Sequence, residues 1–78
     1  MRIKIKLSTI NEVKKFCDYA EIVDCDIYVS QGRYTVSAKS IMGIMSLSLL
    51  NELDLSVDNT TDSFNEFLEN IKELGVVR

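Results

Sequence analysis

The chain has 78 residues, of which 46% are hydrophobic and 27% charged, and its formal net charge at pH 7 is -3. This length predicts one domain, residues 1–78, with a thin core, and the composition is typical of a globular rather than a disordered chain. The sequence contains no histidine, which excludes a Ser-His-Asp triad, histidine-ligated zinc and phosphohistidine transfer. We therefore expect a protein that is not an enzyme and holds no cofactor.

Charge and hydropathy argue against two further classes of partner. Nucleic-acid binding usually needs a basic face, whereas this chain has nine basic against twelve acidic residues and a pI near 4.8. No apolar run approaches the roughly 20 residues of a membrane span, and residues 1–6 lack the apolar core of a signal peptide. We expect a cytoplasmic protein that binds neither nucleic acid nor membrane.

The first elements in chain order are a strand and a helix. Ile3, Ile5 and Leu7 alternate with basic residues, which predicts a strand with one buried face. Thr9 and Glu12 then have the spacing of a capping box, in which each side chain accepts a hydrogen bond from a free backbone donor. The helix that follows has its apolar stripe at Ile10, Val13, Phe16, Cys17 and Ala20.

A hairpin is predicted next. Residues 25–29 and 34–38 each alternate apolar and polar side chains, and the segment between them contains Gly32. Glycine adopts positive φ at no steric cost, which favours a tight β-turn.

The second half of the chain predicts a helix, a strand and a final helix. Ser40 is a candidate N-cap for a helix from Ile41 to about Leu49, which Gly43 weakens by roughly 0.5–1 kcal/mol relative to alanine. Residues 53–57 alternate as a strand, and a helical stripe from Phe64 ends at Gly75. The order β-α-β-β-α-β-α predicts an α+β, two-layer sandwich, with helices on one face of a mainly antiparallel sheet.

The cysteines and the paired aspartates could form reactive or metal-binding sites, but each has an ordinary structural explanation. Cys17 and Cys25 are eight positions apart, which fits no CxxC site, so we interpret them as buried apolar side chains; a regulatory thiol is the alternative. Two acidic pairs lack the glycine-containing loop of a calcium site, and we interpret them as solvated carboxylates rather than metal ligands: Asp24 with Asp26, and Asp54 with Asp58.

Residues 41–50 are the least ordinary part of the chain, because seven of the ten are Ile, Met or Leu. A short helix buries only part of such a set against a sheet, and the remaining apolar side chains can form an exposed patch, as on adaptable binding surfaces. The alternative is that all of these side chains are buried. Ser40, just before this set, is either an N-cap alone or an N-cap that can be phosphorylated.

At these residues the sequence resembles a known family. Residues 38–49 read A-K-S-I-M-G-I-M-S-L-S-L, similar to the A-K-S-[LI]-[FM]-x-[LIV]-M-x-L-x-[LA] segment of HPr, the small phosphocarrier of the bacterial phosphoenolpyruvate-dependent sugar phosphotransferase system. Residues 16–29, Gln31-Gly32 and residues 72–75 extend the similarity over most of the chain. The resemblance implies an open-faced β-sandwich with sheet order 1-4-2-3 and three helices on one side.

The chain departs from the family at the phosphate acceptor, which is a histidine in a G-L-H-A-R-P-A motif at the start of the first helix. Thr9 falls near the histidine position, Asn11 near the arginine and Glu12 near the proline. A hydroxyl does not accept and return phosphate as an imidazole does, and a carboxylate repels a phosphoryl group. We expect no histidine phosphocarrier activity; the alternative is transfer through another acceptor.

The resemblance also implies a second site. In Gram-positive members a dedicated kinase phosphorylates the serine of A-K-S, and the phosphoprotein binds a catabolite-control repressor. Ser40 matches this serine, and Ile41, Met42 and Met45 match the surrounding docking patch. The resemblance therefore implies a regulatory domain in carbon catabolite control, with HPr kinase or a catabolite-control regulator as its partner. The alternative is a diverged module that uses neither phosphorylation site and forms a homodimer through the same patch.

Overall fold

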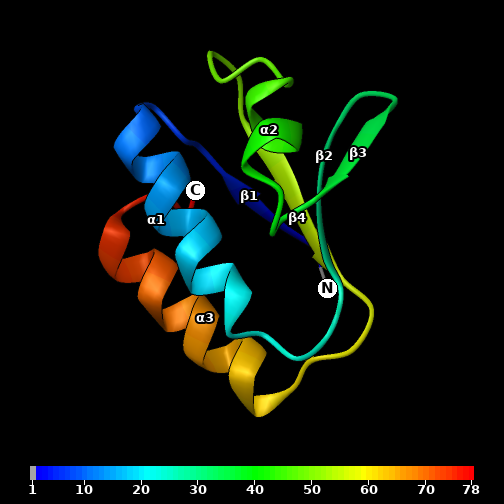
Figure 1. Cartoon of the computed structure of the whole chain (residues 1–78), viewed down its shortest axis with the longest axis vertical. Helices are drawn as coiled ribbons and strands as arrows, with labels where there is room; N and C mark the ends of the chain where they lie inside the picture. Colours follow the sequence, from blue (N-terminus) through cyan, green and yellow to red (C-terminus); the bar gives the residue numbers. More distant parts are fainter. Residues whose placement is uncertain (1) are drawn as a thin grey trace.

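The computed structural model describes residues 2–78; Met1 lies outside them. Its elements follow the predicted order (Figure 1). They are β1 (Arg2–Ile5), α1 (Ile10–Glu21), β2 (Ile27–Gln31), β3 (Tyr34–Ser37), α2 (Ile41–Met45), β4 (Leu53–Val57) and α3 (Asp62–Leu74).

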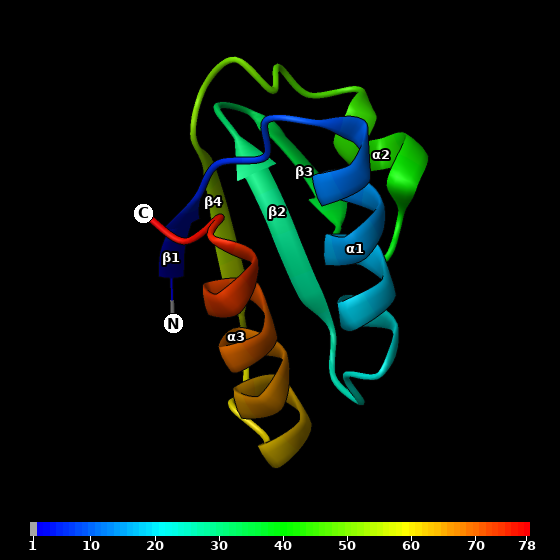
Figure 2. The same cartoon turned by 90° about the vertical axis from the view of Figure 1, so that its left-hand side faces the viewer.

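The four strands form one sheet in the order β1-β4-β2-β3, and each neighbouring pair is antiparallel. Helices α1 and α3 run side by side over one face of this sheet (Figures 1 and 2). On the opposite face Lys4 and Asp54, which are partners in the β1–β4 register, form an ion pair with Nζ 3.0 Å from Oδ1. The predicted α+β sandwich and its 1-4-2-3 order are confirmed.

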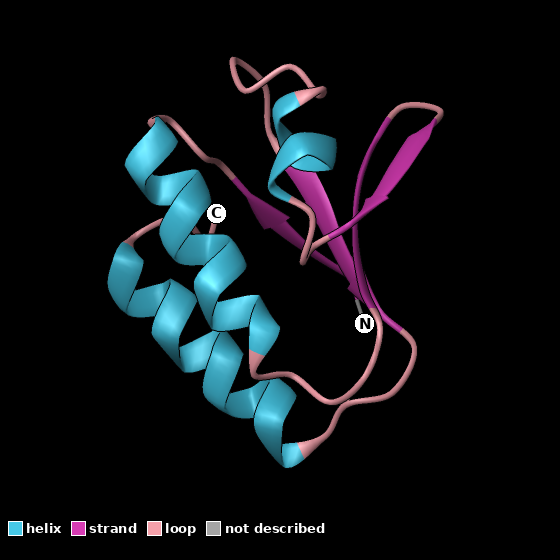
Figure 3. Ribbon diagram, in the orientation of Figure 1, coloured by secondary structure: helices cyan, strands magenta, loops and turns pink. Residues whose placement is uncertain are grey.

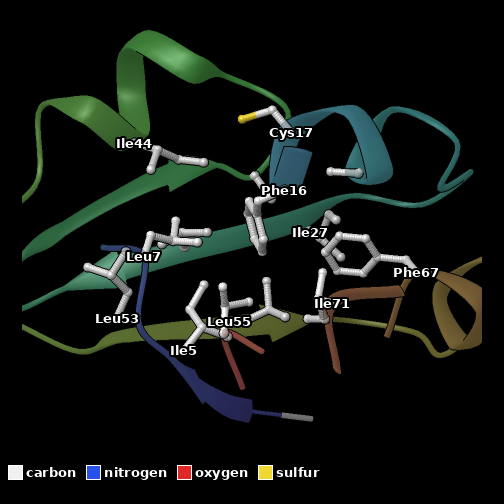
Figure 4. Close-up of a cluster of buried hydrophobic side chains, with 14 of the residues drawn as sticks. Ile5, Leu7, Phe16, Cys17, Ile27, Ile44, Leu53, Leu55, Phe67 and Ile71 are labelled. Carbon is white, nitrogen blue, oxygen red and sulfur yellow. The ribbon is translucent and has the colours of Figure 1, made fainter. Parts of the chain in front are cut away.

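The core lies between the sheet and the two long helices, where side chains from both layers meet (Figure 4). Phe16 of α1 packs edge-on against Phe67 of α3, with ring centroids 5.5 Å apart, and Phe64 lies 6.0 Å from Phe67. All three rings are buried, as the helical spacing predicted. Burial of this apolar surface is the main force that holds the helices on the sheet.

Local signals place the start of α1, the end of α3 and the hairpin turn where they were predicted. Thr9 and Thr61 are the N-caps of α1 and α3, and their hydroxyls accept hydrogen bonds from the third residue of each helix. Gly75 ends α3 in the left-handed conformation with φ +85°, and Gly32 turns the β2–β3 hairpin with φ +60°.

Two predicted boundaries were wrong. Helix α2 ends at Met45 rather than near Leu49, and Figure 3 shows it as a short helix beside the hairpin. It ends there because the residues that follow make tertiary hydrogen bonds instead of helical ones: Gln31 bonds to the backbone of Ser48, and Lys6 Nζ donates to the Leu49 carbonyl. Strand β2 begins at Ile27, so Cys25 lies in the preceding loop and is half-buried.

The C-terminal residues cover the free edge of β1. Val77 forms a β-bridge with Ile5, Lys6 N donates to the Val76 carbonyl at 2.8 Å, and Arg78 N donates to the Lys4 carbonyl at 2.8 Å. This pairing satisfies backbone groups that an open sheet edge leaves exposed. The opposite edge, β3, lies beside α2 and carries the hairpin, so the sheet is asymmetric at its two ends (Figure 1).

Candidate functional site

Ser40 lies at the junction between the hairpin and α2. Its backbone is extended, with φ -103° and ψ 106°, and its Oγ accepts a hydrogen bond from Gly43 N at 3.1 Å. The junction itself is anchored, because Lys39 Nζ donates to the Val23 carbonyl at 2.7 Å and Ala38 N donates to the Ile27 carbonyl at 3.0 Å. The structure therefore confirms that Ser40 is an N-cap, and it leaves the side chain half-buried.

The apolar residues of α2 divide between the core and the surface. Ile44 is fully buried, whereas Ile41, Met42 and Met45 are 37%, 85% and 45% exposed. We call Ile41, Met42 and Met45 the α2 patch. Of the two interpretations of this segment, the exposed patch is correct, because a five-residue helix offers only one side to the core. The structure thus brings Ser40 and all three predicted docking residues together on one short element.

The segment that follows α2 is held by two side chains that the sequence did not single out. Gln31 Nε2 donates to the Ser48 carbonyl at 2.7 Å and Gln31 Oε1 accepts from Ser48 N at 2.9 Å. Lys6 Nζ donates to the Leu49 carbonyl at 2.9 Å. The next residue, Leu50, is 87% exposed and adds apolar surface beyond α2. These contacts keep the segment in place without regular secondary structure.

At the start of α1, local side chains accept hydrogen bonds from the free backbone N–H groups. Thr9 Oγ1 accepts from Glu12 N at 3.1 Å, as the capping box predicted. Glu12 Oε1 accepts from Ser8 N at 2.7 Å, one residue earlier than the predicted reciprocal bond. Asn11 is exposed and carries no positive charge. A carboxylate therefore takes a free backbone donor at this helix end, which is an unfavourable setting for an incoming phosphoryl group.

The pKa values of two groups, Cys17 and Asp24, are shifted by their structural surroundings. Burial, and then the charges of Asp18 and Glu21, raise the pKa of Cys17 to about 11. Hydrogen bonds from the hydroxyls of Ser63 and Thr61 lower the pKa of Asp24. Within residues 2–78 there is no pocket and no cluster of three or more side chains suited to a metal ion.

Comparison with known proteins identifies the family. A family model described as the HPr component phosphorylation site of the phosphotransferase system matches residues 10–75. The chain belongs to the HPr family. The match includes Ser40 and the α2 patch and begins one residue after Thr9. Proteins of this family are phosphocarriers that interact with other proteins of the sugar phosphotransferase system, rather than enzymes.

Solved HPr structures support the assignment. HPr-C-His from Thermoanaerobacter tengcongensis is 32% identical, with a TM-score of 0.70, and the match covers 95% of this chain and 86% of that one. The phosphocarrier protein HPr from Bacillus anthracis str. Ames is 26% identical, with a TM-score of 0.65, and the match covers 88% of each chain. A sequence search of curated proteins found no significant match. No helix within residues 2–78 is long and apolar enough to cross a membrane.

Proposed function

We propose that this HPr-family protein is a cytoplasmic regulatory domain that is phosphorylated at Ser40 and binds a protein partner through the α2 patch, without acting as a histidine phosphocarrier. The observation that carries the proposal is the position of Ser40 directly before Ile41 and Met42, two exposed apolar residues, in a chain that has no histidine. By family resemblance the modifying enzyme is HPr kinase, and the partner is a regulator of carbon catabolite control.

The start of α1 supports the loss of carrier activity. A phosphate carrier needs a group that accepts the phosphoryl group and releases it again, and Thr9 offers only a hydroxyl, which already accepts a hydrogen bond from Glu12 N. The Glu12 carboxylate adds negative charge beside it. Incubation with phosphoenolpyruvate and enzyme I tests this part: we expect no gain in mass, and a phosphorylated product would contradict it.

The apolar character of the α2 patch supports protein binding. Methionine side chains are flexible and polarisable, so they adapt to partner surfaces of different shape. The α2 patch itself carries no charge, so a phosphoryl group on Ser40 would add about -1.5 to -2 charges beside apolar side chains. A partner could then recognise a new charge and the apolar residues next to it together.

Phosphorylation is tested directly with HPr kinase and ATP, followed by intact-mass and fragment analysis. We expect one added phosphoryl group, located on Ser40, and none on a Ser40→Ala variant. Ser46→Ala is the matched control, because Ser46 lies at the opposite end of the same helix and its loss leaves Ser40 in place. A phosphoryl group on any residue other than Ser40, or no modification, would reject the proposal.

Partner binding is tested with the phosphorylated protein and a purified catabolite-control repressor by titration calorimetry. Met42→Lys should abolish binding, since Met42 is the most exposed residue of the α2 patch, whereas Lys14→Ala on α1 should leave it unchanged. Light scattering on the unmodified protein tests the alternative. A dimer that Met45→Lys dissociates would favour a dimerisation module over a phosphorylation-dependent regulator.

A further inference from the structure

Gly43 lies against Ser40 and β3 in a space where a side chain would be tightly packed. A Cβ atom at position 43 would lie 3.0 Å from Ser40 Oγ, 3.1 Å from Val36 Cβ and 3.3 Å from Ser40 Cβ, whereas ordinary van der Waals contacts begin near 3.4 Å. Its φ is not positive, so the glycine is not required by backbone conformation. The close approach of α2 to Ser40 and Val36 is therefore what favours glycine here.

The two neighbours of position 43 differ in their freedom to move. Val36 belongs to β3 and is the register partner of Val29 in β2, so its Cβ moves only if the strand moves. The Ser40 hydroxyl is the end of a short side chain and can rotate about one bond. A methyl group at position 43 would therefore displace Ser40 Oγ first, and the hydrogen bond from the position 43 amide, which is 3.1 Å long, would be lost.

The same displacement would affect modification of Ser40. In the transfer step Ser40 Oγ attacks the γ-phosphorus of a nucleoside triphosphate, the bond from that phosphorus to the β,γ-bridging oxygen breaks, the diphosphate leaves, and the hydroxyl proton passes to a base of the kinase. The attack needs the hydroxyl in one orientation, and the product needs space for three further oxygens around Oγ. A Cβ at position 43, 3.0 Å from Ser40 Oγ, would restrict the orientation of the hydroxyl and the space for the phosphoryl oxygens.

We propose that Gly43 is a positioning residue for modification of Ser40: by lacking a side chain, it sets the orientation of the Ser40 hydroxyl and leaves space for the phosphoryl group. This inference rests on the proposed phosphorylation of Ser40. It also gives Gly43 a role beyond the weakening of the helix that the sequence predicted.

The test compares initial rates of phosphorylation by HPr kinase and ATP for wild type, Gly43→Ala and Ser46→Ala. Ser46→Ala removes the 2.6 Å hydrogen bond to the Gly43 carbonyl, so it weakens α2 without adding an atom near Ser40. We expect Gly43→Ala to be slower by about tenfold or more, and Ser46→Ala to remain within about twofold of wild type. Rates are compared at a temperature at which circular dichroism shows all three proteins folded.

Hydrogen exchange at the position 43 amide supplies a second readout. We expect faster exchange in Gly43→Ala than in Ser46→Ala, because only the first loses the bond to Ser40 Oγ. Equal rates for wild type and Gly43→Ala would overturn the inference and leave phosphorylation of Ser40 intact. Equal slowing in both variants would also overturn it, because helix stability would then explain the effect. An unmodified wild type would reject both this inference and the proposed function.

Discussion

Gln31 and Ser48 exchange two hydrogen bonds although they lie 17 residues apart in the chain. The amide of Gln31 acts as both donor and acceptor, with distances of 2.7 Å and 2.9 Å, so it pairs with the backbone of Ser48 as a neighbouring strand would. This contact joins the end of β2 to the segment after α2. It thereby fixes where the polypeptide leaves the α2 patch.

Replacing Gln31 by alanine should lower the free energy of unfolding by about 1 kcal/mol, because two partly exposed hydrogen bonds are lost. Gln31→Glu is the matched variant: its carboxylate still accepts from Ser48 N but cannot donate to the Ser48 carbonyl, so we expect an intermediate loss. Urea denaturation measures both. Equal stability of wild type and Gln31→Ala would show that solvent replaces these bonds at no cost.

Thr9→Ala should lower the free energy of unfolding by about 1 kcal/mol, since it removes the hydroxyl that caps α1. Thr9→Ser keeps a hydroxyl at the same position and should retain most of the stability. Thermal unfolding followed by circular dichroism at 222 nm, a wavelength that reports helix, distinguishes the two variants. If serine were as damaging as alanine, the Thr9 methyl group rather than the cap would be the source of the stability.

Asp24 should make stability depend on pH in the acidic range. Its pKa is lowered in the folded protein by the hydroxyls of Ser63 and Thr61, so its contribution is present above the ordinary aspartate pKa and is lost as the pH falls through the folded value. We therefore expect Asp24→Asn to be less stable than wild type at pH 7, and the difference to shrink as the pH falls below about 4. Urea titrations at a series of pH values measure it; a difference that is constant with pH would refute the assignment.

The two thiols should differ in reactivity towards a thiolate-selective reagent at pH 8. Cys17 is 2% exposed and burial raises its pKa to about 11, so few of its thiols are ionised or accessible. Cys25 is half-buried in a loop, with its Sγ 3.5 Å from the Asn59 carbonyl oxygen. We expect native protein to react at Cys25, and Cys17 to react only on unfolding. A Cys25→Ser variant that still reacts rapidly in the native state would contradict this.

Local sequence patterns were sufficient for most of the fold. Alternation predicted the buried faces of β1 and β4, and capping residues predicted the ends of α1 and α3 at Thr9 and Gly75. These features depend on residues one to four positions apart, whose relation is the same in any protein. The candidate site was predicted in part for the same reason: the cap at Ser40 is a local motif, and its match to the HPr segment is a run of neighbouring residues.

What lies around Ser40 was decided by tertiary structure. The sequence left open whether Met42 faced the core or the surface, it described Gly43 only as a weak helix residue, and it assigned no role to Gln31. Each outcome depends on how α2 packs against β3 and on which side chains from distant strands reach it. Packing is a property of whole elements in three dimensions, and no spacing along the chain contains it. The absence of histidine, on which the proposed loss of carrier activity rests, can be read from composition alone, whereas the close approach of Gly43 to Ser40 exists only in the folded protein.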